Sequence, residues 1–233
     1  MSGADAGKQA AAEAAAALVE DGMLVGLGTG STVRHLIPVL GRRVREGLRI
    51  VGIPTSTETE ALALAQGITL AEPETRRIDL AIDGADEVER GTLRLIKGLG
   101  GALLREKIIA EWSRRFVVVV DASKVVTTLG ERAPLPVEVV RFGHAATAVR
   151  LAELGGRPAL RRDAAGQPFV TDGGNVIFDC AGFAPIRDPF TLQRQLHGIA
   201  GVVETGLFVD RAERAIIGAA DGSVREMWPG KDG

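Results

Sequence analysis

The sequence predicts an α/β fold built on a doubly wound, mostly parallel sheet, with a second and smaller α/β lobe. Strand and helix patterns alternate over about the first 130 residues, which is typical of parallel sheets. Residues 116–120 read FVVVV, an unbroken apolar run that indicates a strand covered on both faces. Pro134 and Pro136 then precede a region of different character. Because proline removes a backbone donor and favours extended structure before it, we place a domain boundary there.

Each element of the first lobe follows from its local pattern. The N-terminal segment is rich in alanine, the strongest helix former, and glycine or polar turns separate the later strands from their helices. Strands are expected at 23–27, 49–53, 78–82 and 116–120, and helices at 5–21, 33–44, 60–66 and from residue 103 onward.

The region after the prolines predicts the smaller lobe. Its strands are expected at 137–140, 169–171 and 176–179, and its helices at 144–154 and 189–197. Residues 202–209 and 214–217 are again strand-like and are expected to return to the first lobe. The predicted division is therefore a larger domain of residues 1–132 with 206–233, and a smaller domain of residues 133–205.

Composition excludes several classes of protein. The chain has 233 residues, of which 45% are hydrophobic and 25% charged, as in globular domains with a buried core. The net charge is -2 without long runs of like charge, so no nucleic-acid partner is expected. The single cysteine, Cys180, excludes an internal disulfide and suits the cytoplasm. No targeting peptide is expected, nor a membrane span, which needs roughly 18 uncharged apolar residues.

A glycine turn between the first strand and its helix is the strongest candidate for a ligand site. Residues 26–32 read GLGTGST, so free N–H groups and the helix dipole can hold a phosphate, with hydroxyl donors from Thr29, Ser31 and Thr32. The dinucleotide fingerprint fails because Ser31 stands at its sixth position, and the P-loop fails because no lysine precedes Ser31. A phosphate monoester fits the turn better than a dinucleotide, and an ordinary helix cap is the alternative.

Acidic residues follow the strand expected at 78–82, at the sheet edge where α/β proteins bind ligands. Residues 83–87 read DGADE, and Asp83 and Asp86 can accept hydrogen bonds from sugar hydroxyls or hold a cation. A turn rich in Asp and Gly, without a ligand, is the plain alternative. No further acidic cluster or histidine is placed to complete a magnesium site, so no metal is expected.

Two further segments bring a carboxylate and lysines toward the same edge. Lys97 opens the segment KGLGGA. In the following helix, the residues three or four positions from Glu106 are mostly apolar, so Glu106 lies on an apolar face. Lys107 and Glu111 form a pair that can face water. Lost hydration raises the pKa of such a carboxyl and suits it to proton transfer. Lys124 follows the apolar strand. An ordinary ion pair for Glu106 and a solvated turn for Lys124 are the alternatives.

The order of these blocks resembles the type A ribose-5-phosphate isomerase family. The similarity runs from GLGTGST through IPTSTET, DGADEV, KGLGGALLREKII, DASK and LPVEV to LGGRP, TDGGN and GVVETGLF. It implies a cytosolic, usually homodimeric enzyme that interconverts D-ribose 5-phosphate and D-ribulose 5-phosphate without a cofactor. It also implies a Rossmann-like lobe with a smaller ferredoxin-like lobe inserted before the final strands.

Carried over by motif, the resemblance also implies the site residues. Glu106 would be the base that moves a proton through an enediolate, and Lys97 would stabilise the developing oxyanion. Asp83 and Asp86 would hold sugar hydroxyls, and either could assist ring opening. The substrate-binding residues would be Thr29, Gly30, Ser31, Thr32, Asp83, Gly84, Ala85, Asp86, Lys97, Gly98, Leu99, Gly100 and Lys124. The family commonly has glycine where Leu99 stands.

Two other functions fit parts of the pattern. A non-catalytic sugar-phosphate sensor would need a DNA-binding element, and no helix-turn-helix pattern precedes Met23. A metal-dependent phosphatase or transferase would use the acidic segment 83–87 and would lose activity to a chelator. His35, His144 and His197 lie on separate expected helices without metal-ligand spacing, so we interpret them as structural or surface residues.

Overall fold

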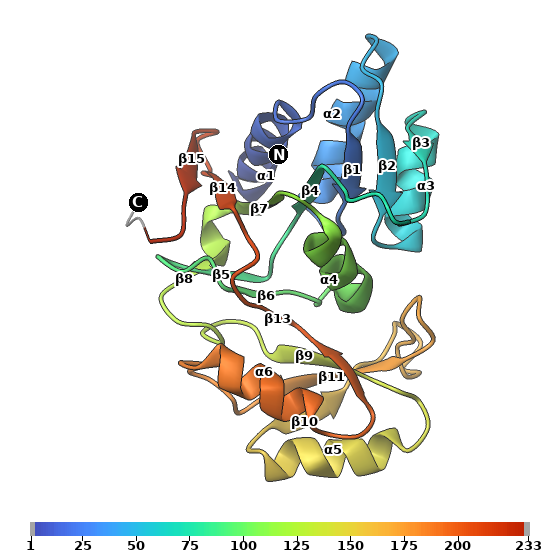
Figure 1. Ribbon diagram of the computed structural model, residues 1–233. Helices are drawn as coiled ribbons and strands as arrows, with labels where there is room; N and C mark the ends of the chain where they lie inside the picture. The colour runs from blue at the N-terminus through green and yellow to red at the C-terminus, as the bar shows by residue number, and fades with distance from the viewer. Residues whose placement is uncertain (1–2, 231–233) are drawn as a thin grey trace.

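A seven-stranded sheet forms the centre of the larger lobe in the computed structural model, which describes residues 3–230 (Figure 1). Its strand order is β15-β14-β7-β4-β1-β2-β3, and every pair is parallel except β14 with β15. The strands are β1 (Leu24–Leu27), β2 (Val51–Pro54), β3 (Thr69–Leu70), β4 (Leu80–Asp83), β7 (Phe116–Asp121), β14 (Arg214–Gly218) and β15 (Val224–Met227). The predicted doubly wound, mostly parallel, Rossmann-like sheet is confirmed.

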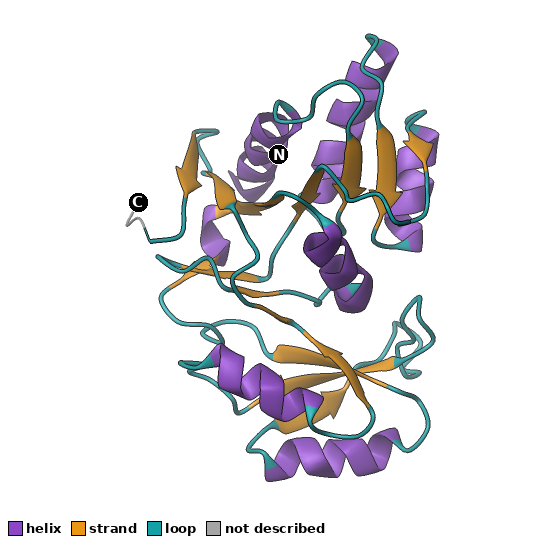
Figure 2. Cartoon of the chain, in the orientation of Figure 1, coloured by secondary structure: helices purple, strands orange, loops and turns teal. Residues whose placement is uncertain are grey.

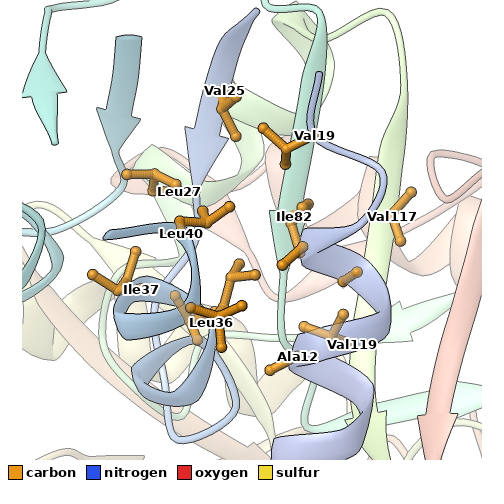
Figure 3. Packing of buried hydrophobic residues seen from close by; sticks show 14 of the residues in the cluster. Ala12, Val19, Val25, Leu27, Leu36, Ile37, Leu40, Ile82, Val117 and Val119 are labelled. Carbon is orange, nitrogen blue, oxygen red and sulfur yellow. The ribbon is translucent and has the colours of Figure 1, made fainter. Parts of the chain in front are cut away.

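The two faces of this sheet pack against different helices, because alternate residues of a strand point to opposite faces. Val117 and Val119 of β7 face the core that Figure 3 shows, together with side chains of α1 and α2. Val118 and Val120 face the opposite core, which includes Ile109 of α4. The FVVVV run is thus covered on both sides, as predicted. The helices of this lobe are α1 (Gly3–Ala16), α2 (Val33–Arg45), α3 (Thr57–Ala65) and α4 (Leu103–Trp112).

The smaller lobe is a four-stranded antiparallel sheet, order β10-β11-β9-β12, on which two helices pack (Figure 2). Its elements are β9 (Leu135–Val139), α5 (His144–Glu153), β10 (Arg157–Leu160), β11 (Val176–Ala181), α6 (Pro189–His197) and β12 (Val202–Thr205). The succession strand, helix, strand, strand, helix, strand is the ferredoxin-like arrangement that the resemblance implies. The division of the whole chain at residues 132 and 206 stays a prediction.

A third sheet, not predicted, lies between these two in Figure 1, with the order β13-β6-β5-β8. Its strands are β5 (Glu87–Glu89), β6 (Leu95–Ile96), β8 (Val125–Val126) and β13 (Leu207–Phe208), and a short 3-10 helix, Ala122–Lys124, leads into β8. These strands are two or three residues long. Segments so short carry no readable alternation of polar and apolar residues.

Two strand predictions were wrong. Residues 169–171 do not form a strand: they belong to the loop between β10 and β11, where only single bridges form. Residues 202–209 form two strands, because the chain turns at Gly206 to leave one sheet for another. A Cβ atom at Gly206 would lie 2.3 Å from the carbonyl oxygen of Lys97, so only glycine permits this approach. The first helix is also shorter than expected and ends at Ala16.

No helix within residues 3–230 is both long and apolar enough to cross a membrane.

Candidate active site

A cavity lies at the carboxyl ends of β1 and β4, where the strand order reverses and where α/β sheets bind their ligands. Four separate parts of the sequence meet there, within residues 29–32, 84–86 and 97–106 and at residue 124. Its lining residues are Thr29, Gly30, Ser31, Thr32, Gly84, Ala85, Asp86, Lys97, Gly98, Gly100, Glu106 and Lys124. Every one of them is among the residues that the sequence predicts for the site. The predicted residues Asp83 and Leu99 do not line the cavity.

The turn after β1 offers free donors to this cavity. The N–H groups of Gly30, Ser31 and Thr32 have no acceptor among residues 3–230. Gly30 has φ of +116°, a conformation that glycine adopts without strain. Thr32 occupies the N-cap position of α2, but its side chain makes no capping hydrogen bond. An ordinary helix cap would use that side chain, so the turn is better suited to binding an anion at the helix N-terminus.

The Thr29 hydroxyl is already engaged in a buried network and is not a free donor. It lies 2.7 Å from the Thr55 hydroxyl and 2.8 Å from the Ser56 hydroxyl. Ser56 in turn caps α3 by accepting from the N–H of Thr59, whose own hydroxyl donates to the carbonyl of Gly28 at 2.7 Å. The IPTSTET segment therefore supports the glycine turn from behind.

Lys97 stands at the centre of a buried group of charges. Its Nζ lies 3.0 Å from Oδ2 of Asp83 and 3.3 Å from Oε1 of Glu106, and it donates to the carbonyl of Gly84 at 2.5 Å. Its side chain is only 2% exposed. Burial acts to lower the pKa of Lys97, but the carboxylates of Asp83 and Glu106 outweigh it and hold the pKa above its ordinary value. Lys97 therefore carries a positive charge in the cavity wall.

Asp83 connects the glycine turn to Lys97. Its Oδ1 accepts from the N–H of Thr29 at 3.0 Å and from the N–H of Gly84 at 2.7 Å, while its Oδ2 faces the Lys97 ammonium. All of these partners belong to the protein, which explains why a residue predicted to contact the substrate lies behind the cavity wall. Asp83 orients the two groups beside it.

Glu106 has one carboxyl oxygen beside Lys97 and one without a partner. Oε2 is buried and makes no hydrogen bond to any residue that the structure describes. Burial raises the pKa of Glu106 to about 8, with a further rise from the charge of Asp83 and an opposing effect of Lys97. The predicted rise is present, although the neighbours include charged groups as well as the apolar sector. Such a carboxyl can exchange a proton near neutral pH.

The prediction that Lys107 and Glu111 form a pair facing water was wrong. Lys107 is buried and donates to Oε1 of Glu204 and to the carbonyl of Thr205, both at 2.7 Å. Glu111 pairs with Arg211 instead. Strand β12 covers this side of α4, which helical spacing alone cannot reveal.

Of the remaining charged candidates, Lys124 and Asp86 line the cavity, whereas Glu87 binds backbone groups away from it. Lys124 lines the cavity, and no residue within 3–230 gives its ammonium a hydrogen bond or ion pair. Asp86 also lines it and accepts from the N–H of Leu99 at 2.9 Å. Glu87 points away and accepts from the N–H groups of Gly130, Arg132 and Ala133. Across the described part of the chain, no three His, Cys, Asp or Glu side chains are grouped to hold a metal ion.

Sequence reasoning missed several residues around the cavity. Phe208 places its ring near two ammonium groups, 5.5 Å from Lys97 and 4.9 Å from Lys107. Asp172, in the loop between β10 and β11, accepts from the N–H of Thr57 at 2.9 Å and lies 3.5 Å from Arg105. Both belong to the GVVETGLF and TDGGN blocks that carry the resemblance. The family resemblance therefore included both residues, but the residues next to them in the sequence form no pattern that predicts these contacts.

Comparison with known proteins agrees with this geometry. The family model of ribose 5-phosphate isomerase A (phosphoriboisomerase A) matches residues 51–222. The chain is 55% identical to ribose-5-phosphate isomerase A of Gluconobacter oxydans, over 98% of this chain and 99% of that protein. It is 52% identical to the protein of the same name in Thermomicrobium roseum, over 94% of this chain and 93% of that one.

Solved structures give the same result. The ribose 5-phosphate isomerase A of Methanocaldococcus jannaschii matches with a TM-score of 0.90 at 41% identity, over 95% of this chain and 97% of that one. A D-ribose-5-phosphate isomerase in complex with phospho-erythronic acid matches with a TM-score of 0.90 at 39% identity, over the same shares of the two chains. The chain therefore belongs to the ribose 5-phosphate isomerase A family.

Proposed function

We propose that this chain interconverts D-ribose 5-phosphate and D-ribulose 5-phosphate through an enediolate, without a cofactor. The observation that carries the proposal is the buried carboxyl of Glu106, which has one oxygen without a partner and a pKa raised to about 8, and which lines a cavity with Lys97 and a glycine turn. The relatives named above are called ribose-5-phosphate isomerases, and one was solved with a phosphorylated sugar acid. The same family likeness supports a cytoplasmic homodimer.

The phosphate would bind at the start of α2. The free N–H groups of Gly30, Ser31 and Thr32 can donate to its oxygens, and the helix dipole favours its negative charge. The unpaired ammonium of Lys124 adds a second positive group in the same cavity. Asp86 would accept from sugar hydroxyls and assist ring opening, because its carboxylate lines the cavity whereas that of Asp83 is occupied.

The proton transfer would use Glu106 and Lys97. The Glu106 carboxylate takes the proton from C2 of the open-chain aldose, and the electron pair of that bond forms an enediolate with the charge on O1. The ammonium of Lys97 stabilises this charge, since a fixed donor in a water-poor site needs no reorganisation. Glu106 then returns the proton to C1, and the O2 hydroxyl proton moves to O1. The product is the ketose, and no external oxidant or reductant is needed.

The Glu106→Gln variant tests this function in an assay of ketose formation from ribose 5-phosphate with a chelator present. We expect the wild type to form ribulose 5-phosphate, and the variant to lose roughly 10²-fold or more in kcat, with a smaller change in KM. The control is Glu111→Gln on the same helix, whose carboxylate pairs with Arg211 away from the cavity. It should keep wild-type turnover.

Three results would contradict the proposal in different ways. Wild-type turnover in Glu106→Gln would remove Glu106 from its role as base. Release of inorganic phosphate, abolished by the chelator, would indicate a metal-dependent phosphatase. Binding of ribose 5-phosphate without any turnover would indicate a sensor.

A further inference from the structure

We propose that Arg161, held by Asp179, is a positioning residue for the active-site loop 97–101 and orients the N–H of Gly100 into the cavity. This inference rests on the proposed function, because it assigns a role in binding the sugar. Arg161 belongs to the smaller lobe, outside every motif to which the sequence assigned a chemical role. In Figure 1 the loop that begins at Arg161 rises from the smaller lobe between β10 and β11 toward α3 and α4.

The guanidinium of Arg161 is fixed on one side and reaches across to the larger lobe on the other. Its Nε donates to Oδ2 of Asp179 at 2.9 Å, and its Nη2 pairs with Oδ1 of the same carboxylate. Its Nη1 donates to the carbonyl of Gly98 at 2.8 Å and to that of Leu99 at 3.1 Å. The side chain is only 12% exposed. A bidentate pair of this kind fixes the plane of the guanidinium.

These bonds fix the orientation of two peptide groups of the loop, Gly98–Leu99 and Leu99–Gly100. In a trans peptide the C=O and the following N–H point in opposite directions. The carbonyl of Gly98 points to Arg161, and the N–H of Leu99 accordingly points the other way and donates to Asp86 at 2.9 Å. The next peptide is held in the same manner, because the carbonyl of Leu99 also points to Arg161. The N–H of Gly100 therefore points away from the guanidinium.

The Gly100 N–H is a free donor at the cavity. It has no acceptor among residues 3–230, and Gly100 lines the cavity beside Asp86 and Lys97. A sugar hydroxyl or the developing oxyanion is the group that such a donor would bind. Phe169 adds a second contact from the same loop of the smaller lobe. Its ring centroid lies 5.9 Å from the Arg161 guanidinium. The ring also fills the space beside Gly101, where an added Cβ would lie 2.4 Å from Cζ of Phe169.

Arg161→Met tests the proposal, with Arg162→Met as its matched control. Among residues 3–230, the Arg162 guanidinium donates to the carbonyl of Gly166 in its own loop and makes no hydrogen bond to residues 97–101. We expect Arg161→Met to lower kcat/KM for ribose 5-phosphate about 10- to 100-fold, with a rise in KM, because a misdirected donor costs binding and orientation. Arg161→Lys should fall between that variant and the wild type, since one ammonium cannot replace the planar fork. Arg162→Met should match the wild type.

The pH profile separates positioning from general loosening of the site. Arg161 is not among the groups that shift the pKa of Glu106, so the acid limb of kcat/KM should stay where the wild type has it. A limb that moves together with the loss of activity would overturn the proposal, as would wild-type kcat/KM in Arg161→Met. If Arg161→Met does not fold, Arg161→Lys decides: lowered kcat/KM with an unmoved limb supports the proposal, and wild-type kcat/KM overturns it. Absence of turnover in the wild type would instead overturn the proposed function, and this inference with it.

Discussion

The ionisation of Glu106 depends on how three carboxylates share one ammonium. Lys97 lies 3.0 Å from Asp83 and 3.3 Å from Glu106, and Asp83 also accepts two backbone N–H bonds. Burial raises the pKa of Asp83 too, but the nearer ammonium and the two N–H donors oppose this rise, so Asp83 holds the negative charge better than Glu106 does. With Asp86 a third carboxylate nearby, Glu106 is the group that keeps a proton near neutral pH, and its pKa rises to about 8.

The charge of Asp86 raises the pKa of Glu106, and its removal should be visible in the pH profile. In the proposed mechanism Glu106 acts as a base, so kcat/KM should rise with pH as the carboxylate forms, through about 8 in the wild type. We expect Asp86→Asn to move this acid limb to lower pH, whatever it does to the maximum rate.

The measurement is kcat/KM against pH, which reports the free enzyme. Glu111→Gln is the control, because Glu111 is not among the groups that shift the pKa of Glu106, and its limb should coincide with that of the wild type. A limb that stays in place or moves upward in Asp86→Asn would show that the Asp86 charge does not act on the base.

At the scale of elements, the site depends on one close contact within the larger lobe and on one contact between α4 and β12. Strands β1 and β4 pair in parallel, and Gly28 lies directly against Asp83 where both strands end. On the other side, Lys107 connects α4 to the chain near β12 through Glu204 and Thr205. Glu106 on α4 and the glycine turn after β1 are thereby held on one sheet edge. A change in either contact should disturb the cavity as a whole.

Gly28→Ala should destabilise the protein through the first of these contacts. A Cβ at this position would lie 2.1 Å from Oδ1 of Asp83 and 2.6 Å from its Cα, so the strand ends would have to separate. We expect the free energy of unfolding to fall by at least about 1–3 kcal/mol, with loss of activity. Chemical denaturation measures the first effect and the ketose assay the second.

Gly84→Ala is the stability control for that substitution. Its Cβ would come no closer than 3.7 Å to another atom, which is ordinary van der Waals contact. The free energy of unfolding should change by less than about 1 kcal/mol in either direction. Equal destabilisation by the two variants would mean that the approach of Gly28 to Asp83 is not what limits the site.

At the scale of the whole molecule, the cavity belongs to the larger lobe but depends on contacts from the smaller one. The loop between β10 and β11 contacts the loop 97–101 through Arg161 and the start of α3 through Asp172. The chain then returns at Gly206, whose carbonyl accepts from the N–H of Lys97 at 2.9 Å. A loop of the smaller lobe and the point where the chain leaves that lobe both contact the segment around Lys97. The lobes are expected to move little relative to each other as long as these bonds hold.

The buried charge of Glu106 should also affect global stability. Its pKa is about 8 in the folded protein, against the ordinary glutamate value of 4.5 in the unfolded chain, so between these values the folded state binds a proton that the unfolded state has released. The free energy of unfolding should therefore fall as pH rises through this window. Glu106→Gln removes this titration, and the variant should gain stability relative to the wild type from about pH 5 to about pH 8.5.

Urea denaturation of both proteins at the two pH values measures this difference. The Glu111→Gln control should follow the wild type, because its carboxylate is half exposed and paired with Arg211. Parallel pH dependence of Glu106→Gln and the wild type would show that burial of Glu106 costs the fold nothing.

The sequence by itself determined the features that depend on residues close together in the chain. The FVVVV run, the alternation of strands and helices and the glycine turn each reflect the conformation of a few consecutive residues, so the central sheet and the turn could be predicted from local patterns. The full set of twelve cavity residues was implied by the family resemblance. Only the tertiary structure decided which side of α4 is covered, where Lys107 is buried, how residues 169–171 fold, and that Arg161 reaches Gly98 and Leu99. These contacts join residues many positions apart, and their energy depends on packing and burial that no local pattern encodes.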